Sequence, residues 1–98
     1  MNWQTALNTF RDYMLLERSF SPNTIEAYLD DVRKFVRYLE IENRAVPPLK
    51  VSQGDLENFI LWVNQLGLEA NSQARLISGL RAFYKFLLVE DLVDDDPT

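Results

Sequence analysis

Large apolar residues recur every three or four positions in four separate stretches of this 98-residue chain, and this period restricts the possible folds more than any other feature. Side chains spaced in this way line one face of an α-helix, because the helix turns once every 3.6 residues or so. Each stretch therefore predicts an amphipathic helix. The first covers residues 2–18, where the stripe consists of Trp3, Leu7, Phe10 and Met14.

Three further apolar stripes follow along the chain. The second helix is expected to begin after Phe20 and to reach about residue 42, with an apolar face made of Ile25, Tyr28, Leu29, Val32, Phe35, Val36 and Leu39. The third stripe consists of Leu56, Phe59, Ile60, Val63 and Leu66. The fourth reaches about Val89, with Leu76, Leu80, Phe83 and Leu87 in one line and Ile77, Tyr84 and Leu88 beside it.

The second helix has a clear start signal. Ser21 is a suitable N-cap, and Pro22 suits the first helical position, where its missing N–H costs nothing. Residues 43–51 contain Pro47-Pro48 and are expected to form a loop.

The later helices have their own boundary signals. Ser52 followed by Asp55 resembles a capping box that opens the third helix, and Gly67 suits a left-handed C-terminal cap. The fourth helix is expected to begin near Asn71 or Ser72 and to end before the acidic stretch.

No segment alternates apolar and polar residues as a half-buried strand does, so the sequence predicts an all-α fold. Four helices with short connections form a compact bundle. We find no internal repeat and no domain boundary before about residue 92. Residues 1–92 are therefore expected to form one domain, and residues 93–98, which contain the extended Asp96-Pro97 dipeptide, to begin a linker.

Cysteine and histidine are both absent, which removes disulfides, thiolate metal sites, the commonest general base and the commonest zinc ligand. The chain has no Gly-rich phosphate loop, no signal peptide pattern and no apolar run long enough to span a membrane. We therefore expect a cytoplasmic protein without catalytic residues, metal, cofactor or small-molecule ligand. Three consecutive acids near the end are interpreted as solvated residues and not as a metal site: Asp94, Asp95 and Asp96.

The net charge of −5 is concentrated at one end of the chain. Residues 90–96 contain five acids and no base, whereas the remaining ten acids balance the ten bases. Residues 71–89 contain Arg75, Arg81 and Lys85 without any acid. The overall acidity therefore does not exclude a partner that carries phosphates.

Helical geometry places Asn71, Ala74, Ser78, Arg81 and Lys85 on one line of the fourth helix, with Arg75 just beside it. Basic and hydroxyl side chains are the types that contact phosphates and base edges, and small residues on this helix, including Gly79 and Ala82, would allow close approach to a surface. The same pattern is also compatible with an ordinary solvated face.

Two other features have competing interpretations. On the second helix, Asp30 is well placed to pair with Arg33 and Lys34, so intrahelical ion pairs explain most of its outer charges. Trp62 lies off the apolar stripe of the third helix. An exposed Trp can mark an interface, but in a small bundle it more often covers a neighbouring helix.

Two motifs in this chain are more specific. The first is Ser21-Pro22-Asn23-Thr24, followed by Ala27-Tyr28, Asp31, Phe35 and Tyr38-Leu39; the second is the run RLISGLRAFYKFL from Arg75 to Leu87. In order and content they resemble the N-terminal domain of Xer-type tyrosine recombinases and phage-like integrases. The similarity covers essentially the whole chain. Asp96-Pro97-Thr98 stands where that family usually has Asn-Pro-Thr.

This resemblance implies a SAM-like core-binding domain whose second and fourth helices cross the major groove on one side of the DNA, opposite a catalytic domain. Its implied partners are double-stranded DNA and other recombinase protomers in a synaptic tetramer. The family's catalytic Arg, Lys, His and Tyr would lie beyond Thr98, so we expect a non-catalytic piece of a longer protein. The implied DNA-binding residues are Asn23, Thr24, Arg75, Ser78, Arg81 and Lys85.

Two alternatives remain at this stage. One is a helical protein–protein interaction module in which Trp62 and the acidic end contact a partner. The other is a free-standing helix-turn-helix regulator, which is disfavoured because the fourth helix is long and largely apolar and does not resemble a short recognition helix.

Overall fold

The computed structural model consists of four α-helices and one short 3-10 helix. In chain order these are α1 (Trp3–Leu16), α2 (Pro22–Ile41), the 3-10 helix η1 (Pro48–Lys50), α3 (Gln53–Gln65) and α4 (Ala70–Val89). The structure describes residues 1–17, 19–90, 92–93 and 97. These residues include no strand, which confirms the prediction of an all-α fold, and none of their helices is long and apolar enough to cross a membrane.

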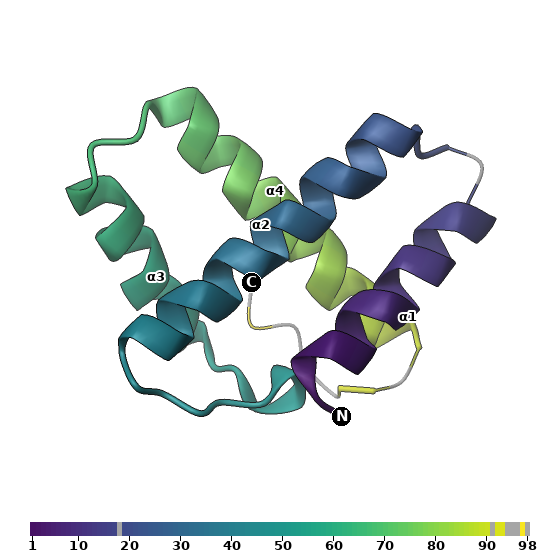
Figure 1. The fold of residues 1–98 in the computed structure, drawn as a ribbon, viewed down its shortest axis with the longest axis horizontal. Helices are drawn as coiled ribbons and strands as arrows, with labels where there is room; N and C mark the ends of the chain where they lie inside the picture. Colours follow the sequence, from purple (N-terminus) through teal and green to yellow (C-terminus); the bar gives the residue numbers. More distant parts are fainter. Residues whose placement is uncertain (18, 91, 94–96, 98) are drawn as a thin grey trace.

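The two longest helices, α2 and α4, have 20 residues each and cross one another. In Figure 1 they form an X, with α2 nearer the viewer and the N-terminal halves of both helices diverging toward the upper edge of the molecule. α1 lies on one side of this crossing and α3 on the other (Figure 1). The N-terminal halves of α2 and α4 therefore lie at the same edge of the domain.

Local capping signals confirm several predicted helix boundaries. The Ser21 hydroxyl accepts a hydrogen bond from the backbone N–H of Thr24 at 3.1 Å, and Pro22 is the first residue of α2. Ser52 and Asp55 form a complete capping box, with hydrogen bonds of 3.1 and 2.9 Å between their side chains and each other's backbone N–H. Gly67 follows α3 with a φ of +80°, as its predicted role as a C-terminal cap requires.

Other boundaries differ from the predictions. α4 begins at Ala70, with Glu69 as N-cap, and so starts earlier than the expected Asn71 or Ser72. Glu69 supplies no side-chain hydrogen bond to the helix, which explains why no capping signal was visible at this position. α1 ends at Leu16, and the predicted end at residue 18 lies outside the described residues.

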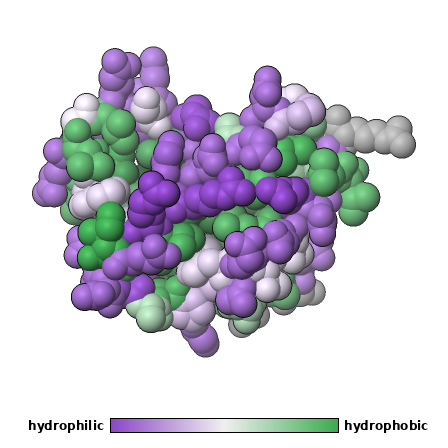
Figure 2. All heavy atoms as spheres, in the orientation of Figure 1, coloured by the Kyte–Doolittle hydropathy of each residue, from purple (hydrophilic) through white to green (hydrophobic). Residues whose placement is uncertain are grey.

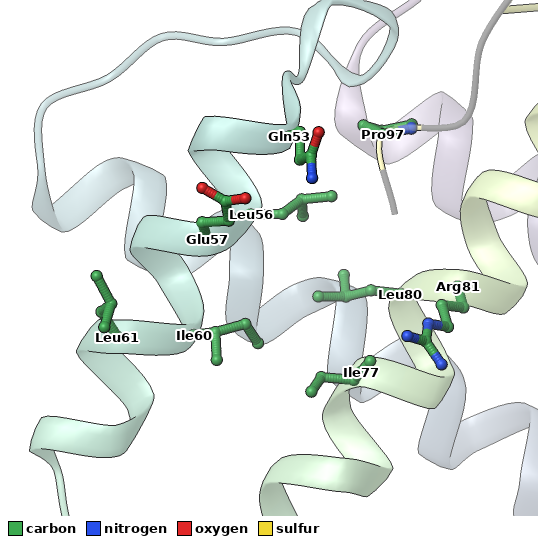
Figure 3. A pocket seen from close by; sticks show the side chains of 9 residues that line it. All are labelled: Gln53, Leu56, Glu57, Ile60, Leu61, Ile77, Leu80, Arg81 and Pro97. Atoms are coloured by element: carbon green, nitrogen blue, oxygen red, sulfur yellow. The ribbon is translucent and has the colours of Figure 1, made fainter.

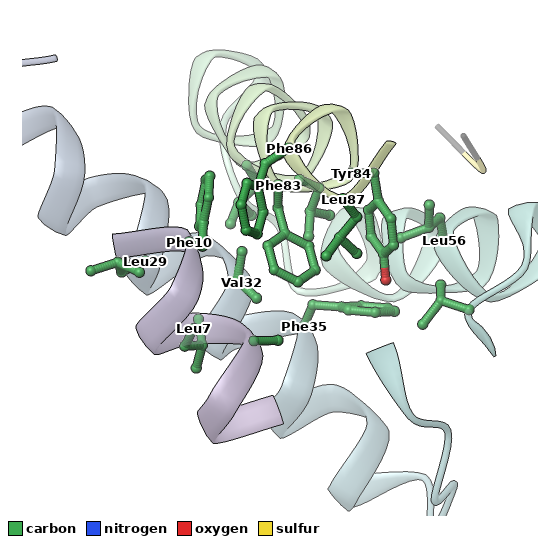
Figure 4. Packing of buried hydrophobic residues seen from close by; sticks show 14 of the residues in the cluster. Leu7, Phe10, Leu29, Val32, Phe35, Leu56, Phe83, Tyr84, Phe86 and Leu87 are labelled. Carbon is green, nitrogen blue, oxygen red and sulfur yellow. The ribbon is translucent and has the colours of Figure 1, made fainter. Parts of the chain in front are cut away.

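The core lies where the four apolar stripes meet, and it is rich in aromatic rings. Phe83 of α4 contacts Phe10 of α1 edge-to-face, with ring centroids 5.3 Å apart, and Phe35 of α2 contacts Phe59 of α3 at 5.2 Å. Figure 4 shows Phe10, Phe35 and Phe83 directed toward the same interior. Such ring pairs add specific geometry to the stabilisation that comes from burying apolar area.

Trp62 belongs to this packed interior and is only partly exposed. Its ring lies 5.2 Å from that of Tyr38 on α2 and 6.2 Å from that of Phe59 on its own helix. The interpretation that Trp62 covers a neighbouring helix is therefore correct, and the Trp no longer supports an interface on α3.

The loop between α2 and α3 is attached to the helices by side chains. The Trp3 indole N–H donates to the Val46 carbonyl at 2.9 Å, and the Tyr84 hydroxyl donates to the Pro48 carbonyl at 3.2 Å. Arg44 forms an ion pair with Asp55 of the capping box. Burial by itself would raise the pKa of Asp55, but hydrogen bonds from Ser52 and the Arg44 guanidinium outweigh it and lower that pKa.

Candidate nucleic-acid interface

The outward side of α4 carries the predicted basic residues. We define the α4 basic face as Arg75, Ser78, Arg81 and Lys85, all of which are exposed. No acidic residue occurs between Ala70 and Val89, so the positive charge of this face is not compensated within α4 itself.

The α4 basic face is wider than the single line expected from the sequence. Arg75 and Arg81 are six positions apart, which separates them by about 120° around the helix axis. Arg75 is on the side of α4 that faces α2, where it pairs with Asp31, whereas Arg81 lines a groove against α3. Ser78 and Lys85 lie between these two flanks.

Arg75 is held by a buried acid at the point where α2 crosses α4. The carboxylate of Asp31 is fully buried, and its Oδ1 accepts a hydrogen bond from the Arg75 guanidinium at 3.0 Å. The Arg75 side chain is 48% exposed, so the guanidinium lies between the buried carboxylate and the solvent. The two residues are 44 positions apart in the sequence, and their ion pair joins the two helices.

Gly79 makes this close crossing possible. A Cβ atom added to Gly79 would lie 2.6 Å from the Cβ and 2.8 Å from the Cγ of Asp31, and even nearer to its Oδ2. The expectation that Gly79 contributes to an outward-facing small-residue surface is therefore wrong, because Gly79 is buried against α2. Its missing side chain makes room for the carboxylate. We call Asp31, Arg75 and Gly79 the crossing site.

The charge of Asp31 is poorly compensated. Burial raises the pKa of this carboxyl from 3.8 to about 6, against the opposing effects of Arg75 and Lys34, and nearby Asp30 raises it further. Asp31 Oδ2 has no hydrogen-bond partner among the described residues. A buried acid with one unpaired oxygen is unusual and requires an explanation.

The hydroxyl groups of the candidate site are already engaged in local hydrogen bonds. Ser78 Oγ donates to the Ala74 carbonyl at 3.1 Å, and the Thr24 and Ser21 hydroxyls lie 2.9 Å apart at the start of α2. Asn23 is exposed beside them. Thr24 and Ser78 therefore have accepting capacity left for a ligand, but their protons are partly committed.

Lys34 is a candidate that sequence reasoning missed. The expected intrahelical pair forms between Asp30 and Arg33, at 2.9 Å, and Arg33 also approaches Glu26. Lys34 is exposed and has no ion pair within the described part of the chain, yet it lies near enough to Asp31 to lower the pKa of that carboxyl. Its spacing from Asp30 predicts an ion pair, so no local pattern indicates that Lys34 is unpaired near the crossing site.

An apolar groove of about 490 Å³ lies between α3 and α4. Figure 3 shows Leu56 and Ile60 of α3 facing Ile77 and Leu80 of α4 across it, with Arg81 beside Ile77. Arg81 thus lies where the α4 basic face meets an apolar surface. In Figure 2, hydrophilic side chains extend across the middle of the face where α2 lies nearest the viewer, with hydrophobic ones toward both sides.

The fold and this surface define a small helical domain with an exposed basic helix face and a buried acid at its main helix crossing. The chain matches the family model described as "Phage integrase, N-terminal SAM-like domain" over residues 7–91, and it therefore belongs to that family. This match confirms the resemblance drawn from the two sequence motifs.

Curated relatives include tyrosine recombinases. The chain is 42% identical to tyrosine recombinase XerD of Chlorobaculum tepidum over 95 residues, which are 97% of the chain and 31% of the relative. It is 36% identical to tyrosine recombinase XerC of Anoxybacillus flavithermus over 97 residues, 98% of the chain and 32% of the relative. The chain thus spans about a third of the length of these relatives.

Proposed function

We propose that this domain binds double-stranded DNA and holds one side of a recombination site. In this proposal α2 and α4 face the major groove, and the contacts come from Asn23 and Thr24 at the start of α2 and from the α4 basic face. The domain itself carries out no chemistry. Strand exchange belongs to a catalytic domain in the part of the relatives that this chain does not span.

The observation that carries this proposal is the charge distribution on α4. Three exposed bases occur on a 20-residue helix without any acid, in a chain whose net charge is −5. Affinity for DNA depends mainly on Lys and Arg near phosphates, so local charge matters more than the net charge. The five acids of residues 90–96 come after α4 in the sequence.

The arrangement of the two crossing helices also fits a duplex. The N-terminal halves of α2 and α4 diverge toward one edge of the molecule (Figure 1). Asn23, Thr24 and Arg75 belong to these N-terminal halves. Arg81 and Lys85 follow the crossing residue Gly79 along α4. Contacts could therefore be distributed along the DNA backbone instead of being confined to one phosphate.

Contacts between neighbouring copies of this domain form a second part of the proposal, because relatives of this chain are recombinases. The apolar groove between α3 and α4 offers a surface for such a contact. A protein–protein interaction module without DNA binding is the alternative, and only that groove favours it.

The DNA-binding proposal predicts a salt-dependent interaction. Replacing Arg81 or Lys85 with alanine should weaken binding to a generic duplex and reduce the slope of log K against log salt by about 1, because each loss removes one phosphate contact. Fluorescence anisotropy titrations at several salt concentrations, beginning at low salt, would measure both quantities.

The matched control is Lys50→Ala, which removes the same charge from η1, outside the proposed surface. This variant should retain the affinity and salt slope of the unmodified chain. Equal losses for Lys50→Ala and Lys85→Ala would show only a general charge effect and would contradict the proposed surface. Undetectable or salt-independent DNA binding together with self-association would favour the interaction module.

A further inference from the structure

The buried carboxylate of Asp31 is difficult to explain by stability alone. It is fully buried, only one of its oxygens accepts a hydrogen bond, and a glycine must stand opposite to make room for it. Moving a carboxylate out of water is costly, and the attraction of an ion pair seldom exceeds that cost. Burial also raises the pKa of Asp31 to about 6, so the charged form is disfavoured in the folded chain. What the carboxylate does provide is a hydrogen bond that holds the Arg75 guanidinium in place.

We propose that Asp31 is a positioning residue that holds the Arg75 guanidinium at the α2–α4 crossing, ready to contact a DNA phosphate. This inference rests on the proposed function and deepens it. Asp31 itself is buried and does not contact the DNA. It acts through Arg75, which occupies the surface above it.

The geometry leaves Arg75 able to bind a phosphate while it remains anchored. Only one guanidinium nitrogen, NH2, is hydrogen-bonded to Asp31, whereas the group has five N–H donors in a planar fork. With 48% of the side chain exposed, the other donors can reach solvent. An anchored guanidinium loses less conformational entropy on binding than a free arginine side chain does.

Exposed Lys34 follows Asp31 by three positions on α2 and has no ion pair among the described residues. Its charge also lowers the pKa of Asp31, so α2 adds to the positive charge near the crossing.

Charge and position predict opposite results for Asp31→Asn. If Asp31 mattered only through its charge, removing an acid beneath a basic face would strengthen DNA binding. If it positions Arg75, the substitution weakens binding, because an amide holds a guanidinium less firmly than a carboxylate does. The sign of the change in affinity therefore separates the two roles.

The experiment compares Asp31→Asn, Arg75→Ala and the double variant in anisotropy titrations on a generic duplex. We expect each single substitution to weaken binding between about twofold and tenfold, the range of one hydrogen-bonded contact. The double variant should bind no more weakly than Arg75→Ala, because Asp31 acts only through Arg75. Asp30→Asn is the matched control. It removes the same charge from the neighbouring exposed residue, which pairs with Arg33, and should leave affinity unchanged or slightly higher.

A second measurement does not depend on DNA. The side-chain Nε–H of Arg75 should show restricted motion in NMR relaxation of the unmodified chain and increased motion in Asp31→Asn. Equal mobility in the two proteins, or tighter DNA binding by Asp31→Asn, would overturn the positioning role. If Arg81→Ala and Lys85→Ala lose affinity while Arg75→Ala and Asp31→Asn do not, this inference fails and the proposed function stands. Absence of DNA binding by the unmodified chain would overturn both.

Discussion

Replacing Gly79 with alanine is expected to lower the free energy of unfolding by about 2 kcal/mol, although glycine to alanine in a helix interior normally raises it by roughly 1 kcal/mol. The added methyl group would lie 2.6 Å from the Cβ of Asp31, too close for van der Waals contact. Because the nearby Asp31 atoms include Cβ and Cγ, the conflict cannot be relieved by moving only the end of a flexible side chain. The two helices must separate. Urea unfolding followed by circular dichroism would measure the loss, which corresponds to a fall in Tm of roughly 8–16 °C.

Gly54→Ala is the control for helix propensity. Gly54 is exposed and lies in the first turn of α3. A Cβ atom added there would meet only the Ser52 hydroxyl oxygen, at an ordinary contact distance of 3.7 Å. This substitution should leave stability unchanged or raise it by up to about 1 kcal/mol. Similar effects of the two substitutions would contradict the close α2–α4 crossing.

The crossing site also gives a physical meaning to the two sequence motifs. Asp31 belongs to the first motif, and Arg75 and Gly79 belong to the second. They are far apart in the chain, yet the structure brings them into contact. Three of the residues on which the resemblance rests therefore meet where α2 crosses α4.

The helices themselves could be predicted from the sequence because their signals are local. Ser21 and Ser52 cap helices through hydrogen bonds to residues three positions away, and Gly67 adopts a conformation that depends on its own backbone. The apolar stripes also defined the core, since a period of 3.6 residues is a property of each helix alone. Where the local signal was missing, at Glu69, the predicted start of α4 was late.

The crossing site could not be predicted because it depends on contacts between distant residues. Asp31 lies at the edge of the apolar face of α2, and nothing in the neighbouring sequence indicates that it is buried. Its partner is 44 positions away. The spacing on α4 alone likewise assigns Gly79 to the outward face, because its contact with Asp31 joins residues far apart in the sequence. A small residue allows close approach on whichever side faces another surface, and here that surface is α2.

The proposed interface was predicted in composition but not in geometry. Helical spacing identified Ser78, Arg81 and Lys85 on the outer side of α4, and all three are exposed. It did not show that Arg75 turns toward α2 or that Arg81 borders an apolar groove. These differences depend on where the neighbouring helices lie, and that information is absent from a single helix.

Asp31→Asn is expected to stabilise the folded chain at neutral pH by about 3 kcal/mol and to change its pH dependence. The pKa of Asp31 is about 6 in the folded chain, against 3.8 for an ordinary aspartate, a difference of about two units. Each unit corresponds to about 1.4 kcal/mol. The penalty arises because burial disfavours the charged carboxylate more than Arg75 and Lys34 favour it. Asparagine has nearly the shape of the neutral acid and carries no charge to desolvate.

The sign of the pH dependence follows from the raised pKa. The folded chain binds a proton at Asp31 more tightly than the unfolded chain does, so this residue makes its full contribution to stability below pH 3.8. That contribution is lost as the pH rises through about 6. Asp55 acts in the opposite direction, because its pKa is lowered in the folded chain. Its contribution to stability is present above pH 3.8 and is lost only as the pH decreases below that value. Urea unfolding between about pH 4 and pH 7 therefore isolates Asp31.

The unmodified chain should lose stability relative to Asp31→Asn across that interval, with the two curves converging near pH 4. Parallel curves, or a less stable variant at neutral pH, would mean that the attraction of Arg75 equals or exceeds the cost of burial. With the positioning role of Asp31, one substitution should change two properties in opposite directions, raising stability while weakening DNA binding. Such opposite changes are expected for a residue whose role is to hold a binding group in place. Substitution of a residue whose role is packing would lower stability and DNA affinity together.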